Sequence, residues 1–173
     1  MAFRSRLPLR AFRIADSRHP VFDSTGAFLK GGRWTSPGKR VIHAAQTYAG
    51  ALLEVLVHLS FADVPSTYRW IELSLPGEQE IEQIISSEIQ NWNTANLTAA
   101  RSFGDLWYEE KRTIALLVPS VVTAGVENNL IINQDHSGFS GIHASAARDV
   151  IWDDRLFKSA EIAFPRRPVS KPV

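Results

Sequence analysis

Alternating apolar and polar side chains predict several β-strands along the chain. The clearest case is the segment 68–75 (YRWIELSL), where Ile71, Leu73 and Leu75 fall on one face of an extended strand. Shorter apolar or alternating runs predict five more strands, over residues 9–14, 41–45, 114–118, 129–132 and 150–152. The chain is therefore expected to contain a sheet of short strands.

Apolar side chains that recur every three or four positions predict helices between these strands. One helix is expected over residues 47–61, where the Thr47 hydroxyl can cap the first turn. A second is expected over residues 97–111, and the acidic segment 78–88 has the isoleucine spacing of a short solvated helix. The apolar stripe of the second helix is expected to comprise Ala99, Phe103, Leu106 and Trp107.

Interleaved helices and strands over 173 residues predict a single α+β domain, with a small mixed sheet and flanking helices. We expect this domain to span residues 1–164. Residues 15–40 are rich in Gly, Pro, Ser, Asp and Arg, which predicts a long connecting loop, and long loops in compact domains are usually functional. Residues 165–173 (PRRPVSKPV) read as a basic, proline-rich tail.

Composition excludes several kinds of chemistry. The chain has no cysteine, so disulfides, zinc ribbons and thiol nucleophiles are ruled out. It has no P-loop pattern, no GxSxG elbow and no HExxH metal motif. The longest apolar stretch, 114–126, is too short to span a bilayer, which takes about 20 residues. We therefore expect a cytoplasmic protein without a membrane partner.

Charge is distributed unevenly along the chain. The net charge is only +1, yet residues 1–40 hold nine of the 19 lysines and arginines beside two acids, Asp16 and Asp23. The near-neutral total argues against attraction of the whole molecule to nucleic acid. The basic amino-terminal quarter instead raises the question of which anion its arginines bind.

The glycine-rich segment 31–38 (GGRWTSPG) is a candidate anion site. Two glycines allow the backbone to approach a ligand closely, and the Arg33 guanidinium offers a planar fork of donors for phosphate. Trp34 is a candidate for stacking on a base or ribose. The alternative is an ordinary turn that buries Trp34 and leaves Arg33 in solvent.

Two further side chains are candidates for a site. Glu54 lies in an apolar helical segment, with the small residues Gly50 and Ala51 on its amino-terminal side leaving room for a ligand. Alternatively, Glu54 and His58 form only the polar stripe of an amphipathic helix. Ser120 follows a proline that must lie at a strand end, where its hydroxyl is either functional or a simple cap.

Several of these segments, in this order, resemble the RES-domain toxins of bacterial type II toxin–antitoxin pairs. The resemblance covers residues 12–157 and is carried by the segments RIAD (13–16), GGRWTSPG (31–38), VIHAA (41–45), ALLEVLVHL (51–59), VPS (118–120) and NNLIIN (128–133). It implies an ADP-ribosyltransferase-like α+β fold and NAD⁺ as the substrate.

The resemblance also implies roles for particular residues. It makes Arg33, Glu54 and Ser120 the catalytic triad, and it makes Arg13, Arg33, His43 and Ser120 the NAD⁺-binding residues. His43 stands where the family usually has tyrosine, and Gln134-Asp135 depart from the family's usual Pro-Ala. No metal is implied, and no cofactor beyond NAD⁺ as the substrate.

The implied activity is growth arrest through cleavage of the nicotinamide–ribose bond of NAD⁺. Water as the acceptor makes the protein a glycohydrolase, and inorganic phosphate as a co-substrate makes it a phosphorylase. One alternative is an ADP-ribosyltransferase that modifies a specific host protein, and another is a non-enzymatic nucleic-acid-binding module. The implied partner is a helical Xre-type antitoxin in a heteromeric complex, with DNA contacted only through that antitoxin.

Overall fold

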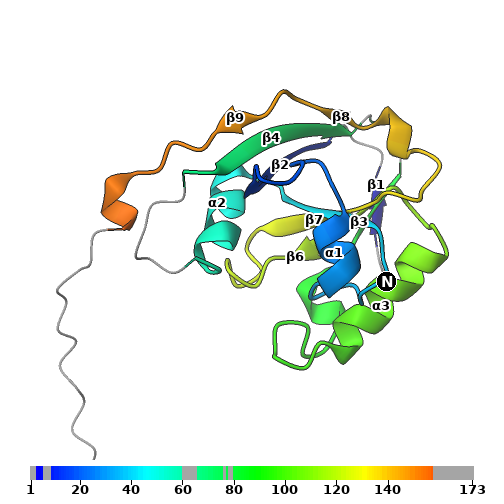
Figure 1. The fold of residues 1–173 in the computed structure, drawn as a ribbon. Coiled ribbons are helices and arrows are strands. Elements are labelled where there is room, and N and C mark those ends of the chain that lie inside the picture. The colour runs from blue at the N-terminus through cyan, green and yellow to red at the C-terminus, as the bar shows by residue number, and fades with distance from the viewer. Residues whose placement is uncertain (1–2, 6–8, 60–65, 76, 78–79, 158–173) are drawn as a thin grey trace, which may run out of the picture.

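The computed structural model describes residues 3–5, 9–59, 66–75, 77 and 80–157, which are built around one mixed β-sheet (Figure 1). The strands are β1 (Phe3–Ser5), β2 (Leu9–Asp16), β3 (Val41–Ala45), β4 (Tyr68–Leu75), β5 (Ile81–Gln83), β6 (Ala115–Pro119), β7 (Asn128–Asn133), β8 (His143–Ala144) and β9 (Arg148–Asp149). The order across the sheet is β1-β5-β6-β7-β3-β2-β4-β8, and β9 also pairs with β4. Only the β5–β6 pair among these is parallel.

In the described ranges, three α-helices and three short 3₁₀ turns connect the strands. The helices are α1 (Thr25–Lys30), α2 (Tyr48–Leu56) and α3 (Thr98–Glu109), and the 3₁₀ turns cover Ser86–Glu88, Phe139–Gly141 and Asp154–Leu156. Within the described residues, no helix is long and apolar enough to cross a membrane. The expected single α+β domain is confirmed at the level of its architecture.

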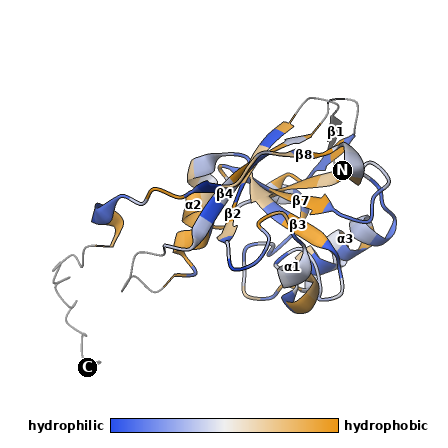
Figure 2. Ribbon diagram, turned by 45° about the horizontal axis from the view of Figure 1, so that its top comes forward, coloured by the Kyte–Doolittle hydropathy of each residue, from blue (hydrophilic) through white to orange (hydrophobic). Residues whose placement is uncertain are grey.

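The central strands are buried on both faces, which explains why they read as continuous apolar runs. On β7, Ile131 packs in one hydrophobic cluster with Trp107 of α3, whereas its neighbour Ile132 packs in a second cluster on the opposite face. A third cluster joins α2 to β2 through Ala51 and Ile14. Hydrophobic colouring marks β3 and β7 in the middle of the molecule (Figure 2). The strands of this buried sheet carry several residues of the site.

Five predicted strands are confirmed, two of them over the predicted residues. Residues 41–45 and 68–75 form β3 and β4, and Ile71, Leu73 and Leu75 are buried on one face as expected. The segments predicted at 9–14, 114–118 and 129–132 form β2, β6 and β7, with ends displaced by one or two residues. The predicted strand 150–152 is wrong, because the chain pairs with β4 slightly earlier, through β8 and β9.

The predicted helices need three corrections. Residues 78–88 do not form a helix over their described part, because Ile81 pairs with β6 as part of β5 and a 3₁₀ turn follows. The segment 15–40 is not wholly a loop, since it contains α1. The helix expected over 47–61 ends at Leu56, although Thr47 caps it as predicted. Residues 60–61 and the proline-rich tail 165–173 lie outside the described residues.

The apolar stripe expected on the second helix is also displaced. The buried side of α3 comprises Ala100, Gly104, Trp107 and Tyr108. Ala99 and Leu106, which were expected in the stripe, are exposed, while Trp107 is fully buried as expected. The helix is therefore rotated relative to its hydrophobic pattern, because its close contact with the loop 32–40 uses a glycine and polar side chains.

This packing predicts very different costs for two leucine truncations. Leu116 in β6 is fully buried, whereas Leu106 on α3 is half exposed. Leu116→Ala should lower the free energy of unfolding by about 2–5 kcal/mol, because it removes buried apolar surface and leaves a cavity. Leu106→Ala should change it by less than about 1 kcal/mol. Urea denaturation measures both values, and equal losses would contradict the described core.

Candidate active site

The floor of the site is set by the alternation of side chains along β3 and β7. His43 of β3 pairs with Ile131 of β7, and Asn129 lies two residues before Ile131 on the same face of that strand. This is the face on which α3 packs, through the cluster that holds Trp107 and Ile131. His43 and Asn129 are therefore presented on one face of the sheet, beside the helices.

The central feature is the carboxylate of Glu54 on α2. Its Oε1 accepts a hydrogen bond of 2.8 Å from the Ser120 hydroxyl and one of 2.6 Å from Nδ2 of Asn129. Ser120 immediately follows β6 and is only 3% exposed. Both bonds go to Oε1, so Oε2 has no hydrogen-bond partner within the described part of the chain. That oxygen can accept a hydrogen bond from a ligand.

Helix α2 is held in place by the same β6–β7 connection that carries Ser120. The Thr47 hydroxyl accepts from the Gly50 amide at 2.9 Å and donates to Oε2 of Glu127 at 2.7 Å. A Cβ at Gly50 would stand 2.8 Å from that carboxylate oxygen, so a larger residue there would displace the Glu127 side chain. The Ser120 amide donates in turn to the Glu127 carbonyl at 2.9 Å. One connection thus fixes both the start of α2 and the partner of Glu54.

Two depressions meet at Glu54. A cleft of about 920 Å³ is lined by Arg33, His43, Glu54 and Asn129, with an apolar wall that includes Val118. A smaller recess of about 320 Å³ lies against the cleft and shares three lining residues with it, namely His43, Glu54 and His58. Arg13 lines this recess. The carboxylate and the imidazole of His43 therefore stand where the two depressions join.

Arg33 is anchored to backbone carbonyls. Its Nη1 donates to the carbonyl oxygens of Trp92 at 2.9 Å and Thr94 at 2.7 Å. Gly31 before it has φ +68°, and a Cβ there would come within 2.7 Å of the Thr35 carbonyl oxygen, so the turn requires glycine.

Trp34, the stacking candidate, is instead buried. It is 4% exposed and its ring stacks on Trp92 with 6.3 Å between the centroids. The turn alternative is thus correct for Trp34. It is wrong for Arg33, which is half-buried and bonded to the protein rather than free in solvent.

Arg13 of β2 is tied even more fully to the backbone. Its guanidinium donates to the carbonyl oxygens of Val21, His43 and Asp23 at 2.5, 2.7 and 3.3 Å. Burial lowers the pKa of Arg13, and the Asp23 carboxylate offsets part of that effect. These bonds join three separate segments at the wall of the recess.

His43 is neutral at physiological pH. Burial and the nearby charge of Arg13 lower its pKa to about 4. A Cβ at Gly32 would lie 3.0 Å from Cε1 of His43, so the imidazole packs directly against the glycine-rich loop. A neutral imidazole presents one donor and one acceptor nitrogen. At the position where the family usually has tyrosine, the site therefore keeps an uncharged aromatic ring that can form hydrogen bonds.

The structure brings together all five residues expected at the site. Ser120 contacts Glu54 directly, Arg33 and His43 line the same cleft as Glu54, and Arg13 lines the recess. Asn129 is a further member of the site, for which no role was expected from the sequence. The available signal was that three asparagines, Asn129 among them, lie in the strand NNLIIN, which is central in the sheet.

Comparison with known proteins places the chain in a family. The model of the RES domain matches residues 10–153, so the chain belongs to the RES domain family. It is 34% identical over 143 residues to "Prs ADP-ribosylating toxin" of Sphingobium sp. (strain YBL2), covering 78% of this chain and 86% of that protein. It is 30% identical over 152 residues to "Toxin Res" of Photorhabdus laumondii, covering 86% of this chain and 97% of that protein. The resemblance noted in the sequence is confirmed.

A solved structure shows the same fold. A chain in the crystal structure of the M. tuberculosis MbcT-MbcA toxin-antitoxin complex matches with a TM-score of 0.69 at 15% identity, covering 85% of this chain and 86% of that one. At this identity the match speaks for the fold alone. It confirms the α+β fold expected from the RES resemblance.

The pKa of His43 predicts a specific dependence of stability on pH. The folded state holds the imidazole neutral down to about pH 4, whereas an unfolded histidine takes up a proton near pH 6.5. The unfolded state therefore binds more protons in this window, and stability falls as pH drops from about 6.5 to 4, by on the order of 2 kcal/mol for this half-buried group. Thermal unfolding of wild type and His43→Gln should show a shallower slope in the variant. Identical slopes would contradict the assignment.

Proposed function

We propose that the protein is the toxin of a toxin–antitoxin pair and that it cleaves the nicotinamide–ribose bond of NAD⁺. The observation that carries this proposal is the Glu54 carboxylate, held by Ser120 and Asn129 where the cleft and the recess join. Membership in the RES domain family and the toxin names of the relatives support it. A volume of about 920 Å³ is in the range of ligand-binding pockets and suits a dinucleotide.

The chemistry requires a fixed negative charge near the reacting carbon. As the bond between C1′ and the nicotinamide nitrogen breaks, its electron pair leaves with nicotinamide and positive charge develops on the ribose. The Glu54 carboxylate would stabilise this charge, and its Oε2 would accept a hydrogen bond from a ribose hydroxyl. Because Ser120 and Asn129 already hold Oε1, little reorganisation is needed during the reaction.

Arg33 is the residue best suited to bind the pyrophosphate. Its two hydrogen bonds to Trp92 and Thr94 use both hydrogens of Nη1. Within the described residues, Nε and Nη2 have no acceptor, so they form an adjacent pair of donors, which is the geometry that matches a phosphate. Arg13 uses all three of its nitrogens for backbone carbonyls. Arg13 can therefore offer a substrate only its positive charge and the one remaining N–H on each terminal nitrogen.

The acceptor decides which reaction follows. Our first choice is degradation of NAD⁺, with water or inorganic phosphate attacking C1′. Transfer of ADP-ribose to a host protein is the second candidate, favoured by the 34% identity to a relative named as an ADP-ribosylating toxin. Incubation with NAD⁺, with and without phosphate, followed by identification of the products distinguishes hydrolysis from phosphorolysis. Biotinylated NAD⁺ in a host extract tests transfer to a protein band.

We also propose a protein partner that holds the activity in check. The fold neighbour was solved in a toxin–antitoxin complex, and this supports an antitoxin for the present chain. We expect a helical Xre-type protein that contributes the DNA contacts of the complex. Co-expression with the product of the adjacent reading frame, followed by co-purification, tests this directly.

Glu54→Gln tests the role of the carboxylate. The amide has nearly the same shape but no charge, so it should lower the rate of NAD⁺ loss by at least about 100-fold while the protein stays folded. Glu110→Gln, an exposed position just after α3, is the matched control and should retain full activity. A fully active Glu54→Gln protein would refute the assignment.

Ser120→Ala tests whether the hydroxyl acts through Glu54. The hydroxyl is buried against the carboxylate. Its loss should therefore lower kcat by about tenfold, while KM for NAD⁺ stays within about twofold. Steady-state kinetics measures both parameters. A raised KM with unchanged kcat would instead show that Ser120 contributes mainly to substrate binding.

A further inference from the structure

The loop that carries Arg33 runs along one face of α3. Nε of Arg101 donates to the Gly32 carbonyl oxygen at 2.9 Å. One turn further along the helix, Asp105 accepts two hydrogen bonds from Ser36, from its amide at 2.8 Å and from its hydroxyl at 2.6 Å. Residues i and i+4 of a helix share one face, so Arg101 and Asp105 lie on the same face of α3. The loop therefore runs along this face in the same direction as the helix.

Between these two contacts the helix and the loop touch backbone to backbone. A Cβ at Gly104 would stand only 1.8 Å from the Trp34 carbonyl oxygen. Any side chain at position 104 would thus push the loop away from the helix. Glycine costs about 1 kcal/mol relative to alanine inside a helix, so its place here reflects this close approach.

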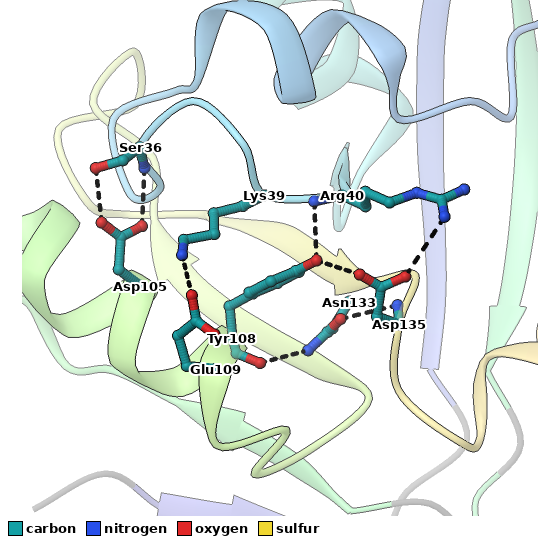
Figure 3. Close-up of polar contacts among 8 residues, drawn as sticks. All are labelled: Ser36, Lys39, Arg40, Asp105, Tyr108, Glu109, Asn133 and Asp135. Carbon is teal, nitrogen blue, oxygen red and sulfur yellow. Dashed lines mark hydrogen bonds and ion pairs between the residues drawn. The ribbon is translucent and has the colours of Figure 1, made fainter.

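The far end of the loop is tied to the helix as well (Figure 3). Lys39 forms an ion pair with Glu109, and the Arg40 amide donates to the Tyr108 hydroxyl at 3.1 Å. That hydroxyl donates to Asp135, one of the two residues that depart from the family pattern. These outer contacts anchor the end of the loop, whereas Arg33 lies at its beginning.

The contacts nearest Arg33 fix its backbone on both sides. Gly32 is held by Arg101, Trp34 lies against Gly104, and Ser36 is held by Asp105. We propose that Arg101, Gly104 and Asp105 form a clamp that positions Arg33 for the anionic phosphates of the substrate. The clamp acts through the loop backbone, so its members are positioning residues. The inference rests on the proposed NAD⁺ activity.

Asp105→Ala is the primary test, with two companion variants. It removes both carboxylate oxygens that accept hydrogen bonds from Ser36, so KM for NAD⁺ should rise by about tenfold while kcat stays within about twofold. Asp105→Asn keeps an oxygen for the Ser36 amide and should recover most of the affinity. Asp149 is an exposed aspartate of β9, which pairs with β4 near one edge of the sheet, and Asp149→Ala should behave as wild type.

The readouts separate positioning from a general loss of structure. Misfolding would lower the active fraction and hence the apparent kcat, but it would leave KM unchanged. Hydrogen exchange of the free protein should show faster exchange of the Ser36 amide in Asp105→Ala. An Asp105→Ala protein with wild-type KM for NAD⁺ would overturn the clamp. If the wild-type protein never consumes NAD⁺, the proposed function is overturned instead. The clamp can still be tested in that case, because a Ser36 amide that exchanges equally fast in Asp105→Ala and in the wild type would overturn it.

Discussion

The hydrogen bonds that Ser120 and Asn129 donate to Glu54 are the interaction around which the site is organised. They exist because β6 and β7 are adjacent antiparallel strands, in register through Val118 and Asn129. The connection between these strands also supplies Glu127, which binds the capping residue Thr47 at the start of α2. The β6–β7 hairpin therefore holds both the Glu54 carboxylate and the start of the helix that carries it. A change in the β6–β7 register would break all of these contacts.

The arginines of the basic amino-terminal quarter are held in a comparable way. Arg13 and Arg33 both donate to backbone carbonyl oxygens, five in total. Neutral acceptors satisfy a guanidinium without neutralising it, so the positive charge stays available to an anionic ligand. Because both side chains are already ordered, a ligand loses less affinity to the entropy of fixing them. This arrangement accounts for two of the nine basic residues that lie within residues 1–40 of a protein whose net charge is only +1.

Local patterns predicted those parts of the fold that depend on local physics. The alternation in residues 68–75 and the Thr47 cap each follow from neighbouring side chains, and both are confirmed. Residues 81–83 were predicted as part of a helix, because their isoleucine spacing suits a helix equally well. Their strand forms only through parallel pairing with β6, more than 30 residues later. The displaced stripe of α3 has a similar origin, since its orientation is set by contacts with the loop 32–40.

The site shows the same division between local and distant contacts. The resemblance to RES toxins pointed to Glu54, Arg33 and Ser120, but no local pattern shows that the hydroxyl of Ser120 faces Glu54 rather than solvent. Asn129 is one of three asparagines in its strand, and no local pattern shows that it is the one that contacts Glu54. The role of Asp105 depends on a loop about 70 positions away in the chain. Contacts of this kind depend on tertiary structure, which only the folded chain reveals.

The central claim is that Glu54 stands beside the bond that breaks. A crystal structure of the Glu54→Gln protein with NAD⁺ tests it most directly, because the variant should bind the substrate without consuming it. We expect the ribose next to nicotinamide to lie within hydrogen-bond distance of residue 54, with the pyrophosphate on Nε and Nη2 of Arg33. A dinucleotide bound elsewhere, or with its adenosine ribose at residue 54, would contradict it.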